Sequence, residues 1–185
     1  MGRLLYLAIA SLDGYIADEQ GSFAWAAPDE EVHRFVNDIE RGVGTGLYGR
    51  EMYEVMVAWE TMDTSGEPEP MRDFAELWRA TDKVVYSATL DAPASARTRI
   101  ERSFDTAAVE QMKAREDRDL SIGGPALAAH AFAAGIVDDV HLILAPVLVG
   151  SGKRALPDTV NGDLELVDAG RFASGFVHLH HRLRR

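Results

Sequence analysis

Two adjacent glycines at positions 123 and 124 carry the strongest chemical signal in the sequence. The segment around them, IGGPAL at residues 122–127, has the pattern of a strand that runs directly into a helix with proline in its first turn. Glycines at such a turn let the backbone approach a pyrophosphate, and the amides and dipole of the helix start offset its charge. The residues expected to bind a dinucleotide cofactor here are Gly123, Gly124, Pro125, Ala126 and Leu127. The alternative is a tight turn without a ligand, because a pair of glycines is not specific.

Two further strand ends carry groups that suit phosphate. Gly49 and Arg50 stand at a second strand-to-helix junction, where the arginine either grips a phosphate or is an ordinary solvated side chain. Ser87, Ala88 and Thr89 follow another expected strand, and their two hydroxyls either bind a 2′-phosphate or only shape a turn. This strand end lacks the acidic residue with which dinucleotide-binding folds grip the ribose diol of NAD. The sequence therefore favours NADPH as the cofactor.

Two carboxylates are candidates for catalysis or substrate binding. Glu31 precedes Phe35 and Ile39 by four and eight residues, so it continues one edge of the apolar stripe of its helix and can reach a pocket. It can donate a proton there, or it can simply complement the helix dipole from the first turn. Asp13 follows the first strand and can contact a substrate or cap the turn.

Two glycine motifs are better explained as ordinary structure. Residues 44–49 satisfy G-x-G-x-x-G, but an expected strand occupies the middle of the motif, where a dinucleotide-binding loop would stand. Residues 150–154 resemble a P-loop, but position 147 is not glycine, and Arg154 stands where serine or threonine is required. We therefore expect neither motif to bind a nucleotide.

Three histidines near the C-terminus invite a metal hypothesis. The alternation of a strand places His178 and His180 on one face and His181 on the other, so at most two of them converge. A solvated edge strand explains them better, and we expect no metal site.

Alternating strands and helices must position these groups. Strands are expected at residues 4–10, 45–48, 83–87, 120–122, 140–145, 164–167 and 176–183. Helices are expected at residues 29–41, 49–57, 71–80 and 107–116, and from the 123–125 turn to residue 134. A long loop is expected at residues 60–70. Alternation followed by strands alone predicts an α/β fold with a mostly parallel central sheet and a C-terminal antiparallel hairpin. Because ligands lie beyond the carboxyl ends of such strands, segments 11–18, 49–50, 87–89 and 123–127 should converge.

Composition and charge limit the class of protein. The 185 residues suit a single domain over residues 1–185, and the apolar runs at 4–10 and 142–149 are far shorter than the ~20 residues of a membrane span. The absence of cysteine excludes disulfides, thiolate metal sites and a thiol nucleophile, and it fits a cytoplasmic location. A net charge of −11 disfavours nucleic acid and anionic membranes as partners, so a polyanionic ligand must be held locally.

Four blocks occur in a fixed order along the chain: SLDGYIAD, LYGREMYEVM, KVVYSATL and LSIGGPALAAHAFAAGIVDDVHLILAPVLVGSG. Together they resemble the C-terminal reductase domain of the bifunctional riboflavin-biosynthesis deaminase/reductase and its stand-alone, dihydrofolate-reductase-like relatives. The resemblance extends over about residues 4–176. It implies a dihydrofolate-reductase-like three-layer α/β/α fold and an NADPH-dependent oxidoreductase that transfers hydride to a small heterocycle, pterin-like or pyrimidine-like.

Matching positions extend the resemblance to individual residues. It implies that Gly49, Arg50 and Tyr53 lie along the cofactor. Residues 87–89 would face its adenosine phosphate, and residues 123–127 would wrap its pyrophosphate. Ala8, Ile9 and Ile16 would lie near the nicotinamide, and Asp13 would point to the substrate. Glu31 is the nearest match to the acid of dihydrofolate reductases, but different loop lengths argue against folate as substrate. The deaminase half needs an H-x-E and P-C-x-x-C zinc signature, which a chain without cysteine lacks, so only reduction remains.

Two alternatives stay open beside the heterocycle reductase. One is a riboflavin-pathway reductase of a ribosylaminopyrimidine, and the other is a non-catalytic ligand-binding or dimerisation domain on the same fold. A homodimer is expected if the apolar side chains of the late strands face a partner rather than the core. Those side chains are Val140, Leu142, Leu144, Val147 and Leu148.

Overall fold

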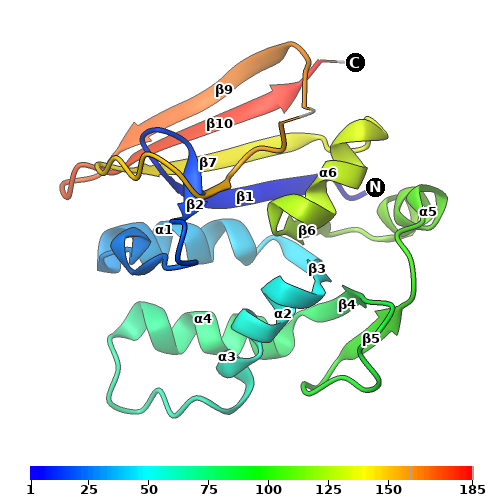
Figure 1. Ribbon diagram of the computed structural model, residues 1–185. Helices are drawn as coiled ribbons and strands as arrows, with labels where there is room; N and C mark the ends of the chain where they lie inside the picture. The colour runs from blue at the N-terminus through cyan, green and yellow to red at the C-terminus, as the bar shows by residue number, and fades with distance from the viewer. Residues whose placement is uncertain (159, 185) are drawn as a thin grey trace.

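The computed structural model describes residues 1–158 and 160–184, and most of its strands belong to one eight-stranded sheet (Figure 1). In order across the sheet, these are β5 (Thr98–Glu101), β4 (Asp82–Tyr86), β3 (Val43–Gly49), β6 (Asp119–Gly123), β1 (Leu4–Ser11), β7 (Asp139–Ala145), β10 (Val177–Leu183) and β9 (Leu164–Arg171). Neighbours from β5 to β7 pair in parallel, whereas β10 is antiparallel to both β7 and β9. The predicted mostly parallel sheet with a C-terminal antiparallel hairpin is confirmed.

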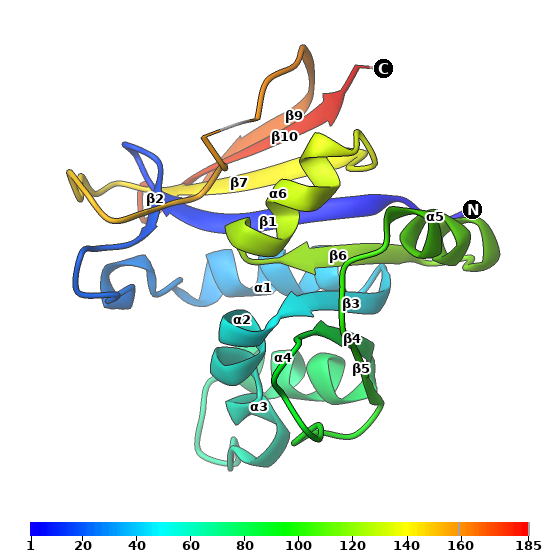
Figure 2. The ribbon, with the colours of Figure 1, turned by 45° about the vertical axis from the view of Figure 1, so that its right-hand side comes forward.

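Helices cover both faces of this sheet (Figure 2). The helices α5 (Thr106–Arg115) and α6 (Pro125–Ala133) pack on one face, and α1 (Glu30–Glu40) and α4 (Glu69–Ala80) pack on the other. The shorter η1 (Ala24–Ala26), α2 (Arg50–Met56) and α3 (Ala58–Thr61) lie in the connections, and β2 (Tyr15–Ala17) pairs with β8 (Lys153–Arg154) in a separate small sheet. The three-layer α/β/α fold is thus confirmed. In the described part of the chain, no helix is both long and apolar enough to span a bilayer.

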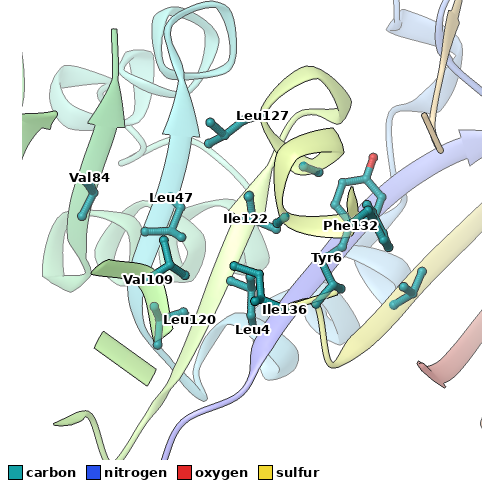
Figure 3. Packing of buried hydrophobic residues seen from close by; sticks show 14 residues of the cluster. Leu4, Tyr6, Leu47, Val84, Val109, Leu120, Ile122, Leu127, Phe132 and Ile136 are labelled. Atoms are coloured by element: carbon teal, nitrogen blue, oxygen red, sulfur yellow. The ribbon is translucent and has the colours of Figure 1, made fainter. Parts of the chain in front are cut away.

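The main core fills the space between the middle strands and the α5–α6 layer. Leu4, Leu47, Val84 and Leu120 are completely buried there (Figure 3). Burying one such side chain stabilises the fold by about 1.5–3 kcal/mol. The Tyr6 ring meets the α6 ring of Phe132 edge to face at 5.5 Å, and its hydroxyl donates to the Ala155 carbonyl. The core therefore reaches to the segment that follows β7.

Helix α1 begins as its sequence predicts. The Asp29 carboxylate accepts a hydrogen bond of 2.9 Å from the Val32 amide, and Glu30 and Glu31 occupy the positive first turn. Val32 is fully buried against the sheet together with β7 Ile143. This cap and contact fix where α1 starts beside the ends of the central strands.

The prediction of a solvated edge strand for the C-terminal histidines is wrong. Strand β10 lies between β7 and β9, and His178 is only 2% exposed. The reason is that β9 pairs outside β10 and takes the edge, while His141 of β7 hydrogen-bonds His178 at 3.1 Å. No group of three potential metal ligands stands among the residues that the structure describes.

Candidate functional site

The carboxyl ends of β4, β3 and β6 meet at one edge of the sheet. Strand β3 lies between the other two, with Gly49 opposite Tyr86 of β4 and Tyr48 opposite Gly123 of β6. Segments 49–50, 87–89 and 123–127 lie at these strand ends: Gly49 and Gly123 are the last residues of β3 and β6, and Ser87 follows β4. The predicted convergence of the phosphate-binding candidates is therefore present in the fold.

The turn after β6 is built for a close backbone approach. Gly124 has φ of +86°, a left-handed conformation that glycine adopts readily, and it precedes Pro125 at the start of α6. A Cβ atom on Gly123 would lie 3.1 Å from the Tyr48 ring, and one on Gly124 would lie 3.4 Å from Met52 Cβ. Both positions therefore favour glycine.

The start of α2 lies beside this glycine turn. A Cβ atom on Gly49 would lie 3.7 Å from Leu127 Cβ, which places the two strand-to-helix junctions in contact. Pro125 and Leu127 are buried, whereas Ala126 is exposed. The first amides of a helix have no partner within the helix, so the 123–127 turn offers donors to an anion.

Arg50 connects these junctions to the turn after β4. Its Nη1 donates to Thr89 Oγ1 at 2.6 Å, and its Nε donates to Glu54 Oε1 at 2.7 Å. The Arg50 side chain is 49% exposed, so it remains open to a ligand. The structure thus brings Arg50 and Thr89 together.

Ser87 differs from its two neighbours, because it is buried while Ala88 and Thr89 are exposed. The Ser87 hydroxyl accepts hydrogen bonds from the amides of Thr89 at 3.3 Å and Leu90 at 3.0 Å. These contacts shape the turn, which is the alternative that the sequence left open. Thr89 therefore offers the accessible hydroxyl of this segment.

Arg102 is a cation at this turn that the sequence did not single out. Its Nη1 donates to the carbonyls of Ser87 at 3.2 Å and Leu90 at 2.7 Å. It follows β5, a four-residue strand whose presence depends on pairing with β4. An isolated arginine after such a short segment gives no signal in the sequence.

The Tyr53 side chain, on α2, is buried and does not lie on the surface at the strand ends. The side chain is 2% exposed, and its hydroxyl accepts from the Ala94 amide at 2.9 Å and hydrogen-bonds Ser95 Oγ at 2.8 Å. Tyr53 therefore tethers the loop after β4, and any effect on a cofactor would be indirect.

Asp13 fastens two loops at the end of β1. Its carboxylate accepts from Ser11 Oγ at 2.6 Å and from the amides of Val149 and Gly150, at 3.1 and 2.7 Å respectively. These hydrogen bonds, led by that from the Ser11 hydroxyl, lower the pKa of Asp13 to about 2. Asp13 is therefore ionised at neutral pH and unsuited to donate a proton.

A strap formed by β2 and β8 covers the end of β1. The Ala155 amide donates to the Gly14 carbonyl at 2.9 Å, and Lys153 reaches Glu51 of α2 at 2.6 Å. Beneath the strap lies a cavity of about 140 Å³. It is lined by Ala10, Gly14, Leu142, Leu144, Arg154, Ala155 and Leu156. Ligand pockets commonly measure about 300–1,000 Å³, so this cavity by itself is too small for a dinucleotide.

The residues expected near a nicotinamide do not share one surface. Ala8 packs with the α5–α6 cluster and Ile9 with the α1 cluster, because successive strand residues face opposite sides. Ile16 stands at the centre of β2. One flat ring can therefore contact the side chain of Ala8 or of Ile9, but not both.

Glu31 hydrogen-bonds the outer hairpin, which is formed by β9 and β10. It is exposed, and its Oε2 accepts from the Ala173 amide, in the β9–β10 turn, at 3.1 Å. It lies on α1, outside the group of segments at the ends of β4, β3 and β6. The structure thus gives Glu31 a structural contact and does not bring it to the glycine turn.

Comparisons with known proteins agree with this architecture. The uncharacterised protein YyaP of Bacillus subtilis (strain 168) is 27% identical over 182 residues, which cover 96% of this chain and 93% of that protein. A putative riboflavin biosynthesis protein from Shewanella sp. PV-4 has a similar structure, with a TM-score of 0.77, 15% identity and 99% coverage of both chains.

A bifunctional enzyme is also structurally similar. The diaminohydroxyphosphoribosylaminopyrimidine deaminase/5-amino-6-(5-phosphoribosylamino)uracil reductase of Thermotoga maritima matches with a TM-score of 0.67 and 16% identity. The match covers 99% of this chain but 57% of that one. The family model described as the RibD C-terminal domain matches residues 4–178. The chain therefore belongs to the RibD C-terminal domain family, as its ordered sequence blocks indicate.

Proposed function

We propose that the protein is an NADPH-dependent reductase that transfers hydride to a small heterocyclic substrate, pterin-like or pyrimidine-like. The observation that carries this proposal is the meeting of the 49–50, 87–89 and 123–127 segments at one sheet edge. Membership of a family that includes reductase domains supports it. NADPH would supply the hydride, and the protein would supply binding, orientation and exclusion of water.

The residues at this edge fit such a cofactor. A Cβ atom on Gly123 would crowd Tyr48 and Met52, and Gly124 has φ of +86°, so both positions favour glycine, and no side chain separates the backbone of this turn from a pyrophosphate. Arg50 and Thr89 would hold a further phosphate. Ala8 or Ile9, with Ile16, would line the nicotinamide, while Asp13 would hold the covering strap in place.

The direct test is turnover of NADPH by the purified protein against a panel of pterins, flavins and pyrimidines. We expect substrate-dependent oxidation of NADPH with at least one class. If NADPH neither binds nor is oxidised, the non-catalytic ligand-binding or dimerisation domain becomes the better account.

A riboflavin-pathway ribosylaminopyrimidine is the second candidate substrate. The Thermotoga maritima relative carries uracil reductase in its name, and this chain spans 57% of its length. This candidate predicts that the phosphoribosylated aminopyrimidine is reduced much faster than the free base. Equal rates, or reduction of pterins alone, would exclude it.

We also propose that the protein forms a homodimer through its outer hairpin. Val140 is buried in the core, but Leu166 on the edge strand β9 is 57% exposed and Leu148 is 72% exposed. Leu164, two residues before Leu166 on β9, is 46% exposed, and Val177, which pairs with Arg171 at the other end of the hairpin, is 37% exposed. An exposed apolar edge strand invites pairing with another chain, so the partner surface is β9 rather than β7. A cytoplasmic location remains a prediction.

A further inference from the structure

A second cavity lies at the opposite ends of the strands from the glycine turn, where β1 and β7 begin and β10 ends (Figure 1). Its volume of about 380 Å³ falls within the range of about 300–1,000 Å³ that is common for ligand pockets. The residues that line it are Met1, Gly2, Arg3, Lys113, Asp138, Arg182 and Leu183. Three of these seven residues carry a positive charge, and Leu183 adds apolar surface. The lining therefore suits a small organic anion.

A buried carboxylate holds the two arginines of this cavity. Asp139, the first residue of β7, is 1% exposed, and its Oδ2 lies 2.9 Å from Arg3 Nη1. Its Oδ1 lies 3.3 Å from Arg182 Nε. Arg182 stands directly opposite Asp139 in the pairing of β10 with β7, so the strand register fixes this contact. Two guanidinium groups thus converge on one carboxylate beside the cavity.

Both guanidinium groups keep donors for a ligand. The side chains of Arg3 and Arg182 are 42% and 39% exposed. Arg182 donates to Asp139 through Nε, whereas Asp139 Oδ2 accepts no hydrogen bond from the described residues, so Arg3 is held by charge alone. A guanidinium carries five N–H donors. The Nη groups of Arg182 and the N–H groups of Arg3 can therefore donate to an oxyanion.

The charges at this end of the sheet balance. Lys113 of α5 has a side chain that is 8% exposed, and its Nζ lies 2.5 Å from Asp138 Oδ2. Asp119, whose carboxylate accepts from the Arg3 amide at 2.8 Å, is a third acid beside Asp138 and Asp139. Three cations therefore face three carboxylates here, although the whole chain carries a net charge of −11. An anion is repelled less than that net charge suggests, and directed N–H groups must recognise it.

We propose that Arg3 and Arg182 form a binding site for a small organic oxyanion, a carboxylate or a phosphate monoester, in this cavity. A planar guanidinium presents paired N–H donors that match two oxygens of such a group. Asp139 orients both arginines, and Leu183 contacts the carbon skeleton of the ligand. The site goes beyond the proposed function, because it takes a ligand other than the cofactor at the strand ends opposite the segments proposed to hold NADPH.

The experiment is an NMR titration of backbone amides with succinate and with glycerol phosphate, in the absence of nucleotide. Sodium chloride at the same ionic strength is the control. Shift changes should saturate in residues 2–4, 138–140 and 181–183, with a dissociation constant of about 1 mM or tighter for at least one organic anion. The anion that binds more tightly shows whether a carboxylate or a phosphate is preferred.

Variants assign the binding to the two arginines. Arg3→Gln and Arg182→Gln each leave Asp139 with the other arginine and with His180, whose Nε2 lies 2.8 Å from Asp139 Oδ1, so both should fold. Each should weaken anion binding by roughly 10-fold or more, because a charge-assisted hydrogen bond is lost. Arg182→Lys keeps the charge beside Asp139 but loses the planar donors, so it should also bind more weakly. The control Arg171→Gln removes an exposed arginine at the other end of the hairpin and should change the dissociation constant by less than about 2-fold.

Three results would overturn this site. They are the absence of saturable shifts at these residues, equal changes with sodium chloride, and unchanged dissociation constants in all the Arg3 and Arg182 variants. Shift changes confined to residues 49–50, 87–90 and 123–127 would also overturn it, because the anion would then bind at the proposed cofactor edge. That last outcome would leave the proposed function intact, whereas failure of NADPH oxidation would leave this site untouched.

Discussion

A buried cluster of three histidines, His141, His178 and His180 on strands β7 and β10, makes the free energy of unfolding depend on pH. His141 of β7 and His180 of β10 stack with ring centroids 4.0 Å apart, and His141 Nδ1 lies 3.1 Å from His178 Nε2. His141 is 8% exposed and His178 2% exposed, and the α1 ring of Phe35 covers His178 at 4.5 Å. Asp139, 1% exposed, binds His180 at 2.8 Å. The substitution His141→Gln removes the titration of one ring while keeping donors and acceptors for His178.

Burial, assisted by the charges of the other two histidines, lowers the pKa of His141 from its ordinary 6.5 to about 4. Between these two values the unfolded chain binds more protons than the folded protein, so stability is lost as the pH falls. Integrating this difference from about pH 7 to about pH 4.5 gives a loss of about 2 kcal/mol from His141 alone. The pKa of His178 is also lowered by burial, which adds a loss of the same sign, although the charge of Asp168 opposes it.

Glu40 acts in the opposite direction, so the native pH profile alone does not isolate the histidine. Burial raises the pKa of Glu40 to about 7, and its contribution to stability is therefore lost as the pH rises from about 4.5. The assay is urea unfolding of the native protein, His141→Gln and Glu40→Gln at both pH values. Relative to the native protein, His141→Gln should lose about 2 kcal/mol less on acidification, and Glu40→Gln should lose more. Identical pH dependence of the native protein and His141→Gln would refute this reasoning.

Three further substitutions test other parts of the structure. Gly124→Ala should destabilise the protein by about 1 kcal/mol in thermal unfolding, because φ is +86° there, and it should weaken NADPH binding in a fluorescence titration. Lys83→Met should lower the free energy of unfolding in urea by about 2–3 kcal/mol, because the buried Lys83 ammonium caps the C-terminal end of α4 by donating at 2.7 Å to the carbonyls of Trp78 and Thr81. An unchanged unfolding midpoint would contradict this role of Lys83. Leu166→Lys should convert a dimer to monomer in light scattering, and a native monomer would remove the proposed interface.

The sequence predicts best where one local pattern determines the structure. The apolar run of β1 gives a strand between β6 and β7, and the cap at Asp29 gives the start of α1. The strand-to-helix turn at Gly123 and Gly124 is likewise predicted from its own residues, because the left-handed backbone of Gly124 and the crowding of Gly123 by Tyr48 and Met52 both favour glycine. These features need little information from distant residues.

The elements that the sequence misses depend on distant partners. The short strands β2 and β8 form by pairing with each other across more than a hundred residues, and β5 forms by pairing with β4. The expected loop at residues 60–70 is shorter than predicted, because α3 extends to Thr61 and α4 begins at Glu69. Arg102 reaches the turn after β4 because β5 pairs with β4, so its position beside that turn is visible only in the fold.

The central claim is that NADPH binds where β4, β3 and β6 end, and an NMR titration of backbone amides with NADPH tests it most directly. The largest shift changes should fall in residues 49–52, 87–90 and 123–127. Changes centred on the cavity of about 380 Å³ at the opposite edge of the sheet, lined in part by Arg3, Lys113 and Arg182, would contradict the claim, as would no change at all.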